Sequence, residues 1–276
     1  MIRSKSHAAR LMTTLAAAAA IALPAASGAQ DNRPVVVVFT FTNSSIGPAR
    51  AEFDGIATGV QDLLITDMAS NAKIRLVDRS RIAEILQEQD LVKNKQVDAQ
   101  TAVRVGKILG AQYAVTGGFM SDGSGKAVLT GRTIDIETTQ IANPEKIEGK
   151  SADVMGMIAD LSSRLDKNMN LAAKPVRRVG DAGEAPKSAP AKSAPAQSGA
   201  PASASAKAST NVEQYAKPMS EKSKQVKLDG ATLKLYSNAL DEIDRKNTAK
   251  AKELLKQVLA KYENWEPAQR QLEKLG

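Results

Sequence analysis

The sequence contains no cysteine, and its single histidine is His7, close to the start of the chain. Without cysteine, no disulfide can staple the fold and no lipid can be attached through an N-terminal cysteine. Serine–histidine and cysteine–histidine nucleophilic pairs, and the usual zinc and copper sites, need residues that the rest of the chain lacks. The composition therefore predicts a protein that is not an enzyme, with no catalytic residues, no metal site and no cofactor.

The sequence also lacks any apolar run of the roughly 20 residues that a transmembrane helix needs. Its longest apolar run, residues 11–23, is rich in alanine and follows a basic start formed by Arg3, Lys5 and Arg10. Small residues end the segment, as at a signal-peptidase cut. We therefore expect residues 1–29 to be a cleaved signal peptide, and the exported chain to be periplasmic with at most peripheral contact to a membrane.

The net charge of +8 is distributed unevenly along the chain. Residues 1–29 carry +3, residues 30–173 carry −2, residues 174–227 carry +6 and residues 228–276 carry +1. A nucleic-acid-binding face needs basic residues gathered on a folded element. Because most of the basic excess lies in the signal peptide and in residues 174–227, we expect no nucleic-acid partner.

Residues 30–173 show the alternation of strand and helix patterns that is typical of an α/β domain. Ser80 is the expected N-cap of one helix and Asp98 that of the next. The pattern predicts a mixed sheet of about five strands flanked by helices. The predicted strands are 35–38, 74–77, 111–120, 127–137 and 140–147, and the predicted helices are 53–68, 80–89, 99–109 and 151–168.

Two further segments follow this domain. Residues 174–227 are rich in Ala, Pro, Ser and Lys and nearly free of bulky apolar residues, so they predict a disordered linker. Residues 228–276 have apolar stripes at helical spacing, and their helical hairpin resembles one tetratricopeptide (TPR) repeat, with Ala251 and Leu255 at its small and bulky positions. A single repeat leaves an apolar face uncovered, and we expect it to dock on a partner, on a second copy, or back on the first domain.

The stretch from Val77 to Gln89 reads VDRSR, then Leu86, then Glu88-Gln89. It resembles the V-E-R-S-R…L…E-Q signature of the CsgG family, and further similar blocks run from residue 35 to about residue 165. The resemblance implies a CsgG-like periplasmic domain with a role in curli assembly or secretion. The chain departs from the well-known lipoprotein members, because it has no cysteine for a lipid anchor. It also has Thr139 where the family usually carries Gly, which leaves the turn type open.

The curli-type members of this family form an outer-membrane pore from hairpins inserted among these strands. Each inserted hairpin needs roughly twenty residues. The turns left between the predicted strands, 121–126 and 137–139, are too short for that. The sequence therefore predicts that this chain has no transmembrane pore hairpins of its own.

Two weak chemical signals have simpler explanations. The Gly-Ser-Gly-Lys stretch at 123–126 is similar to part of a phosphate-binding loop, but it joins two predicted strands and is better explained as a hairpin turn. Asp135 and Glu137 share one face of a predicted strand. They are candidates for a glycosidase-type carboxylate pair, but surface charges on an exposed edge are the favoured explanation.

Six residues are candidates for contact with a partner or another subunit: Arg79, Glu88, Gln89, Tyr236, Tyr262 and Trp265. For the first three, an alternative is an internal ion pair that fixes the joint between strand and helix. The sequence as a whole predicts a non-catalytic envelope protein that acts by protein–protein contact in secretion or assembly, on the outer-membrane side of the periplasm. Its partners would be envelope proteins or further copies of itself. The alternative is an accessory regulator that activates a periplasmic enzyme such as a cell-wall synthase.

Overall fold

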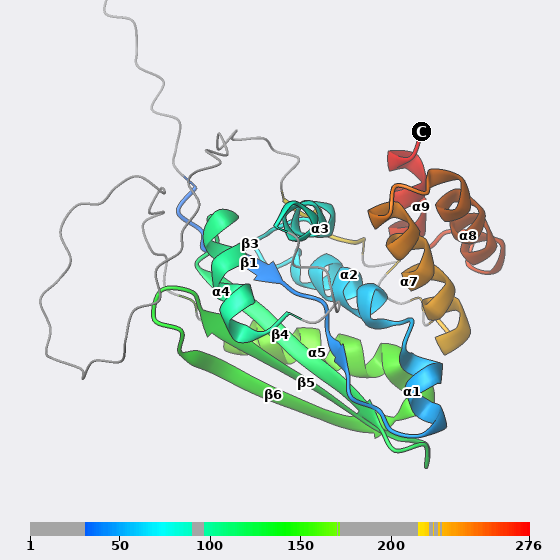
Figure 1. Cartoon of the computed structure of the whole chain (residues 1–276), viewed down its shortest axis with the longest axis horizontal. Helices are drawn as coiled ribbons and strands as arrows, with labels where there is room; N and C mark the ends of the chain where they lie inside the picture. Colours follow the sequence, from blue (N-terminus) through cyan, green and yellow to red (C-terminus); the bar gives the residue numbers. More distant parts are fainter. Residues whose placement is uncertain are drawn as a thin grey trace, which may run out of the picture. The chain divides into compact units, whose positions relative to one another are not determined.

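A computed structural model (Figure 1) describes the part of the chain that follows the predicted signal peptide. Residues 1–29 and most of the predicted linker lie outside the described residues. Contacts divide the chain into Met1–Asp31 and Asn32–Gly276, and every helix and strand named below belongs to the second unit. The described residues are 31–89, 97–169, 171, 215–220, 223, 226 and 228–276.

The second unit is built on a mixed six-stranded sheet in the order β3-β1-β4-β5-β6, with the short β2 paired to β4. β1 runs parallel to β3 and β4, whereas β4, β5 and β6 form an antiparallel meander. The predicted mixed sheet is confirmed, and the one unpredicted strand, β2, is too short to show a periodic pattern. The strands are β1 Val35–Val38, β2 Thr42–Asn43, β3 Arg75–Leu76, β4 Tyr113–Ser121, β5 Lys126–Asp135 and β6 Ile141–Lys150.

Helices cover both faces of this sheet (Figure 1). Helix α4 packs on β4, whereas α5 packs on β5 and β6 from the opposite side and also contacts α2. All four valines of β1 are buried, as expected of a central strand that is covered on both faces. The helices of this part are α1 Pro48–Phe53, α2 Ala57–Met68, α3 Arg79–Glu88, α4 Ala99–Ile108 and α5 Val154–Asn168, with the 3₁₀ turn η1 Ser151–Asp153.

Two details of the predicted helices need correction. The helix predicted at 53–68 is split, because α1 ends at Phe53 and α2 begins at Ala57. The predicted N-cap at Ser80 is wrong, since the cap of α3 is Asp78, whose side chain accepts from the Ser80 backbone N–H at 2.9 Å. The Asp98 cap of α4 is confirmed, with its side chain accepting from the Thr101 N–H at 2.7 Å.

Both predicted hairpin turns are present. Residues 122–125 join β4 to β5, and the Asp122 carboxylate accepts from the Ser124 N–H and hydroxyl. The Gly-Ser-Gly-Lys stretch is therefore a strand-to-strand turn. In the next turn, Thr139 has a left-handed backbone with φ of 60°, the conformation that glycine adopts most easily.

The C-terminal module, residues 228–276, consists of α7 Gly230–Asp244, α8 Thr248–Lys261 and α9 Glu266–Lys274. Helix α7 packs on α2, and buried side chains of the module belong to the same apolar core as the sheet. Of the three predicted docking modes, the structure therefore shows docking back on the first domain. The described chain resumes inside the predicted linker, where Tyr215 forms a β-bridge with Val77 and its ring lies under the Arg75 guanidinium.

Among the described residues, no helix combines the length and the apolar character needed to cross a membrane. Within the same residues, no three His, Cys, Asp or Glu side chains gather closely enough to hold a metal ion.

Candidate functional site

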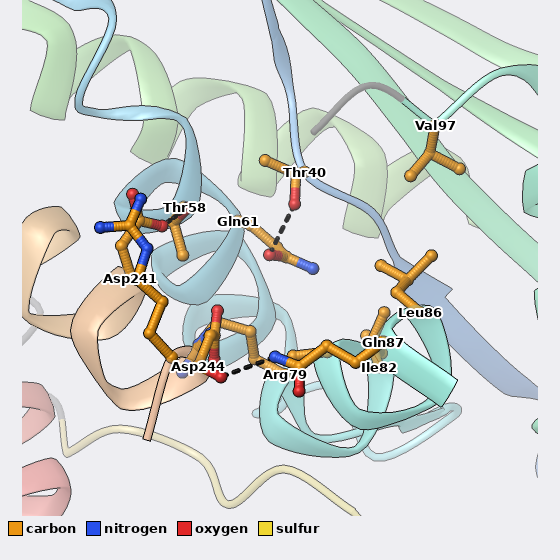
Figure 2. A pocket seen from close by; sticks show the side chains of 12 residues that line it. Thr40, Thr58, Gln61, Arg79, Ile82, Leu86, Gln87, Val97, Asp241 and Asp244 are labelled. Atoms are coloured by element: carbon orange, nitrogen blue, oxygen red, sulfur yellow. Dashed lines mark hydrogen bonds and ion pairs between the residues drawn. The ribbon is translucent and has the colours of Figure 1, made fainter. Parts of the chain in front are cut away.

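A cavity of about 130 Å³ lies where α2, α3 and α7 meet, and Figure 2 shows the side chains around it. Its wall on α3 is mainly apolar and includes Ile82 and Leu86. The opposite wall is polar. The lining residues are Thr40, Thr58, Gln61, Arg79, Ile82, Ala83, Leu86, Gln87, Val97, Asp241, Asp244 and Arg245. This meeting of two helices of the α/β domain with one helix of the C-terminal module is called the seam below.

Arg79 is the central charge of the seam, with only 3% of its side chain exposed. One terminal guanidinium nitrogen, Nη1, donates to both carboxylate oxygens of Asp244 at 2.7 Å. Its Nε lies 3.5 Å from Oδ1 of Asp62. Burial by itself lowers the pKa of Arg79, but the two carboxylates outweigh burial and the net shift is upward. Arg79 therefore remains a cation inside the seam and pairs with acids from α2 and α7.

Asp62 on α2 is the second buried charge of the seam. It accepts a hydrogen bond from the hydroxyl of Tyr236 on α7 at 2.6 Å. Burial raises the pKa of Asp62, while Arg79 and Tyr236 lower it, and the net shift is upward. Burial also raises the pKa of Tyr236, and the nearby Asp62 carboxylate raises it further, so this phenol stays a donor. Asp62 of α2 thus lies between the guanidinium of Arg79 on α3 and the phenol of Tyr236 on α7.

The N-terminus of α2 is capped by the C-terminal module. Ile56 occupies the N-cap position and offers no side-chain acceptor. Instead, the Ser237 hydroxyl accepts from the Gly59 N–H at 3.0 Å, and the Thr58 hydroxyl donates to Asp241 at 2.7 Å. The first N–H groups of a helix need such acceptors, and a nearby carboxylate also suits the positive end of the helix dipole. The N-terminus of α2 is therefore completed by residues that lie 178 and 183 positions after their partners in the sequence.

The sequence of α7 explains how one helix makes all these contacts. The buried apolar residues Leu233 and Leu240 and the polar residues that reach α2 and α3 recur at steps of three and four, which places them on one helix face. Gly59 allows α7 to come close, because a Cβ atom built there would lie 3.2 Å from Cβ of Ser237. The polar residues of this α7 face are Tyr236, Ser237, Asp241 and Asp244.

The structure brings together three of the six residues predicted to contact a partner. Arg79 and Tyr236 both contact Asp62, and Trp265 packs edge-on against Tyr236 with ring centroids 4.6 Å apart. All three are buried in this conformation. Their contacts here are within the chain, and their contact with a partner stays a prediction.

The other three predicted contact residues lie outside the seam. Glu88 and Gln89 are exposed at the C-terminal end of α3. Tyr262 is half-buried, and its hydroxyl donates to Asp229 at 3.1 Å. The ion pair considered for Arg79 needs correction, because among the described residues its carboxylate partners are Asp62 and Asp244 on other helices, not Glu88.

Sequence reasoning missed the acids and the serine that pair across the seam. For the three on α7 a signal was present, since they follow its apolar stripe at helical steps. Asp62 has no such signal, because it lies on the side of α2 opposite the stripe of Val60 and Leu64 and would be expected in solvent. The missed residues are Asp62, Ser237, Asp241 and Asp244.

The carboxylates considered for glycosidase chemistry are placed differently from the prediction. β5 ends at Asp135, so Glu137 lies beyond the strand. The Asp135 carboxylate accepts from the backbone N–H groups of Glu137 and Thr138 at 3.0 and 3.1 Å. Asp135 therefore shapes the turn between β5 and β6 in the manner of an Asx turn.

Part of the chain is similar to a known protein family. The family model described as "Curli production assembly/transport component CsgG" matches residues 16–125. The chain is therefore similar to the CsgG family over this stretch. The matched stretch contains β1 to β4 and α1 to α4, and so includes the α2 and α3 side of the seam. The C-terminal module lies outside it. No curated protein sequence matches the chain.

Solved structures with a similar chain course include three bacterial proteins. The C-terminal domain of LpoB from Escherichia coli is 17% identical, with 43% of this chain and 84% of that chain covered and a TM-score of 0.34. The lipoprotein GNA1162 from Neisseria meningitidis is 12% identical, with 50% and 99% covered and a TM-score of 0.36. A PelC dodecamer from Paraburkholderia phytofirmans is 14% identical, with 48% and 89% covered and a TM-score of 0.26. These values are too low to assign a partner or an activity to this chain.

Proposed function

We propose that this protein is an exported, non-catalytic component of the bacterial cell envelope that acts by contact with other proteins. The match to the CsgG family over residues 16–125 carries the proposal, because that family is described as a component of curli production, assembly and transport. The role proposed here is in secretion or assembly on the outer-membrane side of the periplasm. The partner is an envelope protein.

The geometry of the seam favours a role in binding other proteins and not in binding or converting a small molecule. The cavity of about 130 Å³ is smaller than the roughly 300–1,000 Å³ typical of small-molecule sites. The charged groups around it already have partners. Arg79 pairs with acids on two other helices, Asp241 accepts from the Thr58 hydroxyl, and Arg245 pairs with a glutamate on its own helix. Pairing of this kind positions one helical surface on another.

In vivo photo-crosslinking tests this function in the full chain. A photo-crosslinking residue placed at Glu88 or Gln89, both exposed on α3, should capture a discrete envelope protein, which mass spectrometry then identifies. The same residue at Asp160, exposed on α5, serves as the matched control and should capture less of that protein. Absence of any adduct at the α3 positions would contradict the proposed contact surface. Hydrolysis of purified peptidoglycan that is lost in an Asp135→Asn variant would contradict the non-catalytic role.

The oligomeric state of the protein distinguishes the role in secretion or assembly from the alternative role as a regulator. Light scattering of the purified chain gives the number of copies directly. A ring of many copies favours a role in secretion or assembly. A monomer favours the alternative, an accessory regulator that activates a periplasmic enzyme such as a cell-wall synthase.

A further inference from the structure

The contacts of α7 with α2 and α3 resemble an interface in which one protein binds a helix of another protein. Two carboxylates one helical turn apart, on Asp241 and Asp244, reach the Thr58 hydroxyl and the Arg79 guanidinium. Besides these, the Gln87 side chain donates to the Asp244 carbonyl at 2.6 Å. Side-chain contacts between helices with complementary charges determine which helix can bind and in which register it binds.

The seam also contains a cavity and a buried donor that has no hydrogen-bond partner among the described residues. The cavity of about 130 Å³ lies directly beside these contacts. Among the described residues, the buried Arg79 Nε–H has no hydrogen-bond partner, although Asp62 lies 3.5 Å away. A buried donor without a partner destabilises the packed state. Contacts between domains of one chain generally resemble transient protein–protein interfaces, and this void and this donor fit that class.

The C-terminal module is part of the same chain, so its release from the seam would not separate it from the molecule. Residues 172–214 separate α5 from the next described stretch, which begins at Tyr215. A module tethered in this way competes with any partner for the seam at a high effective concentration. A partner must therefore present the same chemistry and bind better.

We propose that the α2–α3 face is the surface on which this protein binds its partner, and that α7 occupies it as an intramolecular stand-in. The partner element is an amphipathic helix of another protein that carries two carboxylates one turn apart. One carboxylate would take the place of Asp244 on Arg79, and the other the place of Asp241 at the N-terminus of α2. This inference rests on the proposed function and names the surface and the partner chemistry that the function uses.

An engineered disulfide provides the test, because the chain has no cysteine of its own. A Cβ at position 59 would lie 3.2 Å from Cβ of Ser237, close to the roughly 3.5–4.5 Å span of natural disulfides. The double variant Gly59→Cys with Ser237→Cys should hold α7 on the seam when oxidised and release it when reduced. The two redox states of one variant are matched controls for each other.

The probe is a fluorescent synthetic peptide with the sequence of residues 228–247. It is added to a full-length double variant that also carries Asp241→Asn and Asp244→Asn, so that the peptide offers the two carboxylates that the tethered α7 then lacks. The reduced protein should bind it at least about tenfold more tightly than the oxidised protein, because only the reduced seam can open. A peptide carrying Asp241→Asn and Asp244→Asn should bind the reduced protein at least about tenfold more weakly than the unmodified peptide. Equal binding in the two redox states, or no binding by the reduced form, overturns the proposal.

Hydrogen exchange of the unmodified protein gives a measurement that needs no variant. Amides of α7 to α9 should exchange by a local opening, faster than amides of β4 and β5. Equal exchange in the two regions means that the module leaves the seam only when the whole protein unfolds, which also overturns the proposal.

A second copy of the chain is the competing occupant. If a Gly59→Cys chain mixed with a Ser237→Cys chain forms a disulfide between the two molecules, the seam takes α7 from another copy, and the assignment to a different protein is wrong. Absence of such dimers supports the proposal. The crosslinking test at Glu88 and Gln89 uses exposed positions outside the seam, so the proposed function can hold when this inference fails.

Discussion

The Tyr236 hydroxyl donates a 2.6 Å hydrogen bond to the Asp62 carboxylate across 174 positions of sequence. Both side chains are buried, and Arg79 lies against the same carboxylate. This contact ties the C-terminal module to the helix at the centre of the α/β domain. Four predictions follow from this network and from two local features elsewhere in the chain.

Replacing Tyr236 by Phe should lower the free energy of unfolding by about 1–3 kcal/mol. The variant keeps the ring and its packing but leaves the buried Asp62 without one of its donors. Urea denaturation measures the change. Tyr262→Phe is the matched control, since its partner Asp229 is more exposed and also accepts from Thr232 and Lys261, and it should cost less than about 1 kcal/mol. Equal losses would show that Asp62 does not depend on the phenol.

Replacing Arg79 by Ala should lower the free energy of unfolding by about 3–5 kcal/mol, because Asp62 then remains buried without its cation. Adding Asp62→Asn to the same chain should recover part of the loss, since the uncompensated charge is removed. Arg81→Ala should cost less than about 1 kcal/mol, because its pair with Glu84 is largely exposed. Chemical denaturation compares the variants, and a double variant no more stable than Arg79→Ala would contradict the assigned role of Asp62.

Replacing Thr139 by Gly should raise the free energy of unfolding by up to about 1 kcal/mol. Thr139 has φ of 60°, where a branched side chain is strained, and relief of that strain outweighs the extra freedom of Gly in the unfolded chain. Thr138 does not have a positive φ, so Thr138→Gly should destabilise by about 0.5–1 kcal/mol. Thermal unfolding distinguishes the two variants, and a lower melting temperature for Thr139→Gly would contradict the strain.

The stability contributed by Asp229 should depend on acid pH. Its hydrogen bond with Lys261 lowers the pKa of this carboxyl below the ordinary value of 3.8, and the helix N-terminus at Thr232 lowers it further. Because the folded-state pKa is depressed, the contribution is present above about pH 4 and is lost as the pH falls through the folded-state pKa. Asp229→Asn keeps a good N-cap but removes the charge.

Urea denaturation of both chains at neutral pH and at acid pH tests this dependence. The unmodified chain should be more stable than Asp229→Asn at neutral pH, and the difference should shrink as Asp229 takes up its proton. A difference that is constant over this range would show that the carboxylate charge contributes nothing.

The elements of the α/β domain could be predicted because their signals are local. Val35–Val38 is a continuous apolar run, as a strand covered on both faces requires, and Asp98 stands where an N-cap belongs. The split between α1 and α2 escaped prediction because the apolar stripe runs on through the break. β2 escaped because its two residues pair with β4 through backbone contacts that no side-chain pattern records.

The sequence by itself determined which chemistry the chain carries, the order of its strands and helices, and the CsgG-type blocks, because residue identity and short-range periodicity are enough for these. Only the tertiary structure decided which acids meet Arg79, which residues cap α2, and where the C-terminal module docks. Most of those contacts join residues more than 150 positions apart. The exception is the ion pair between Asp62 and Arg79, which lie closer together in the sequence. Their partners are selected by the packing of whole helices, a property that no local stretch of sequence contains.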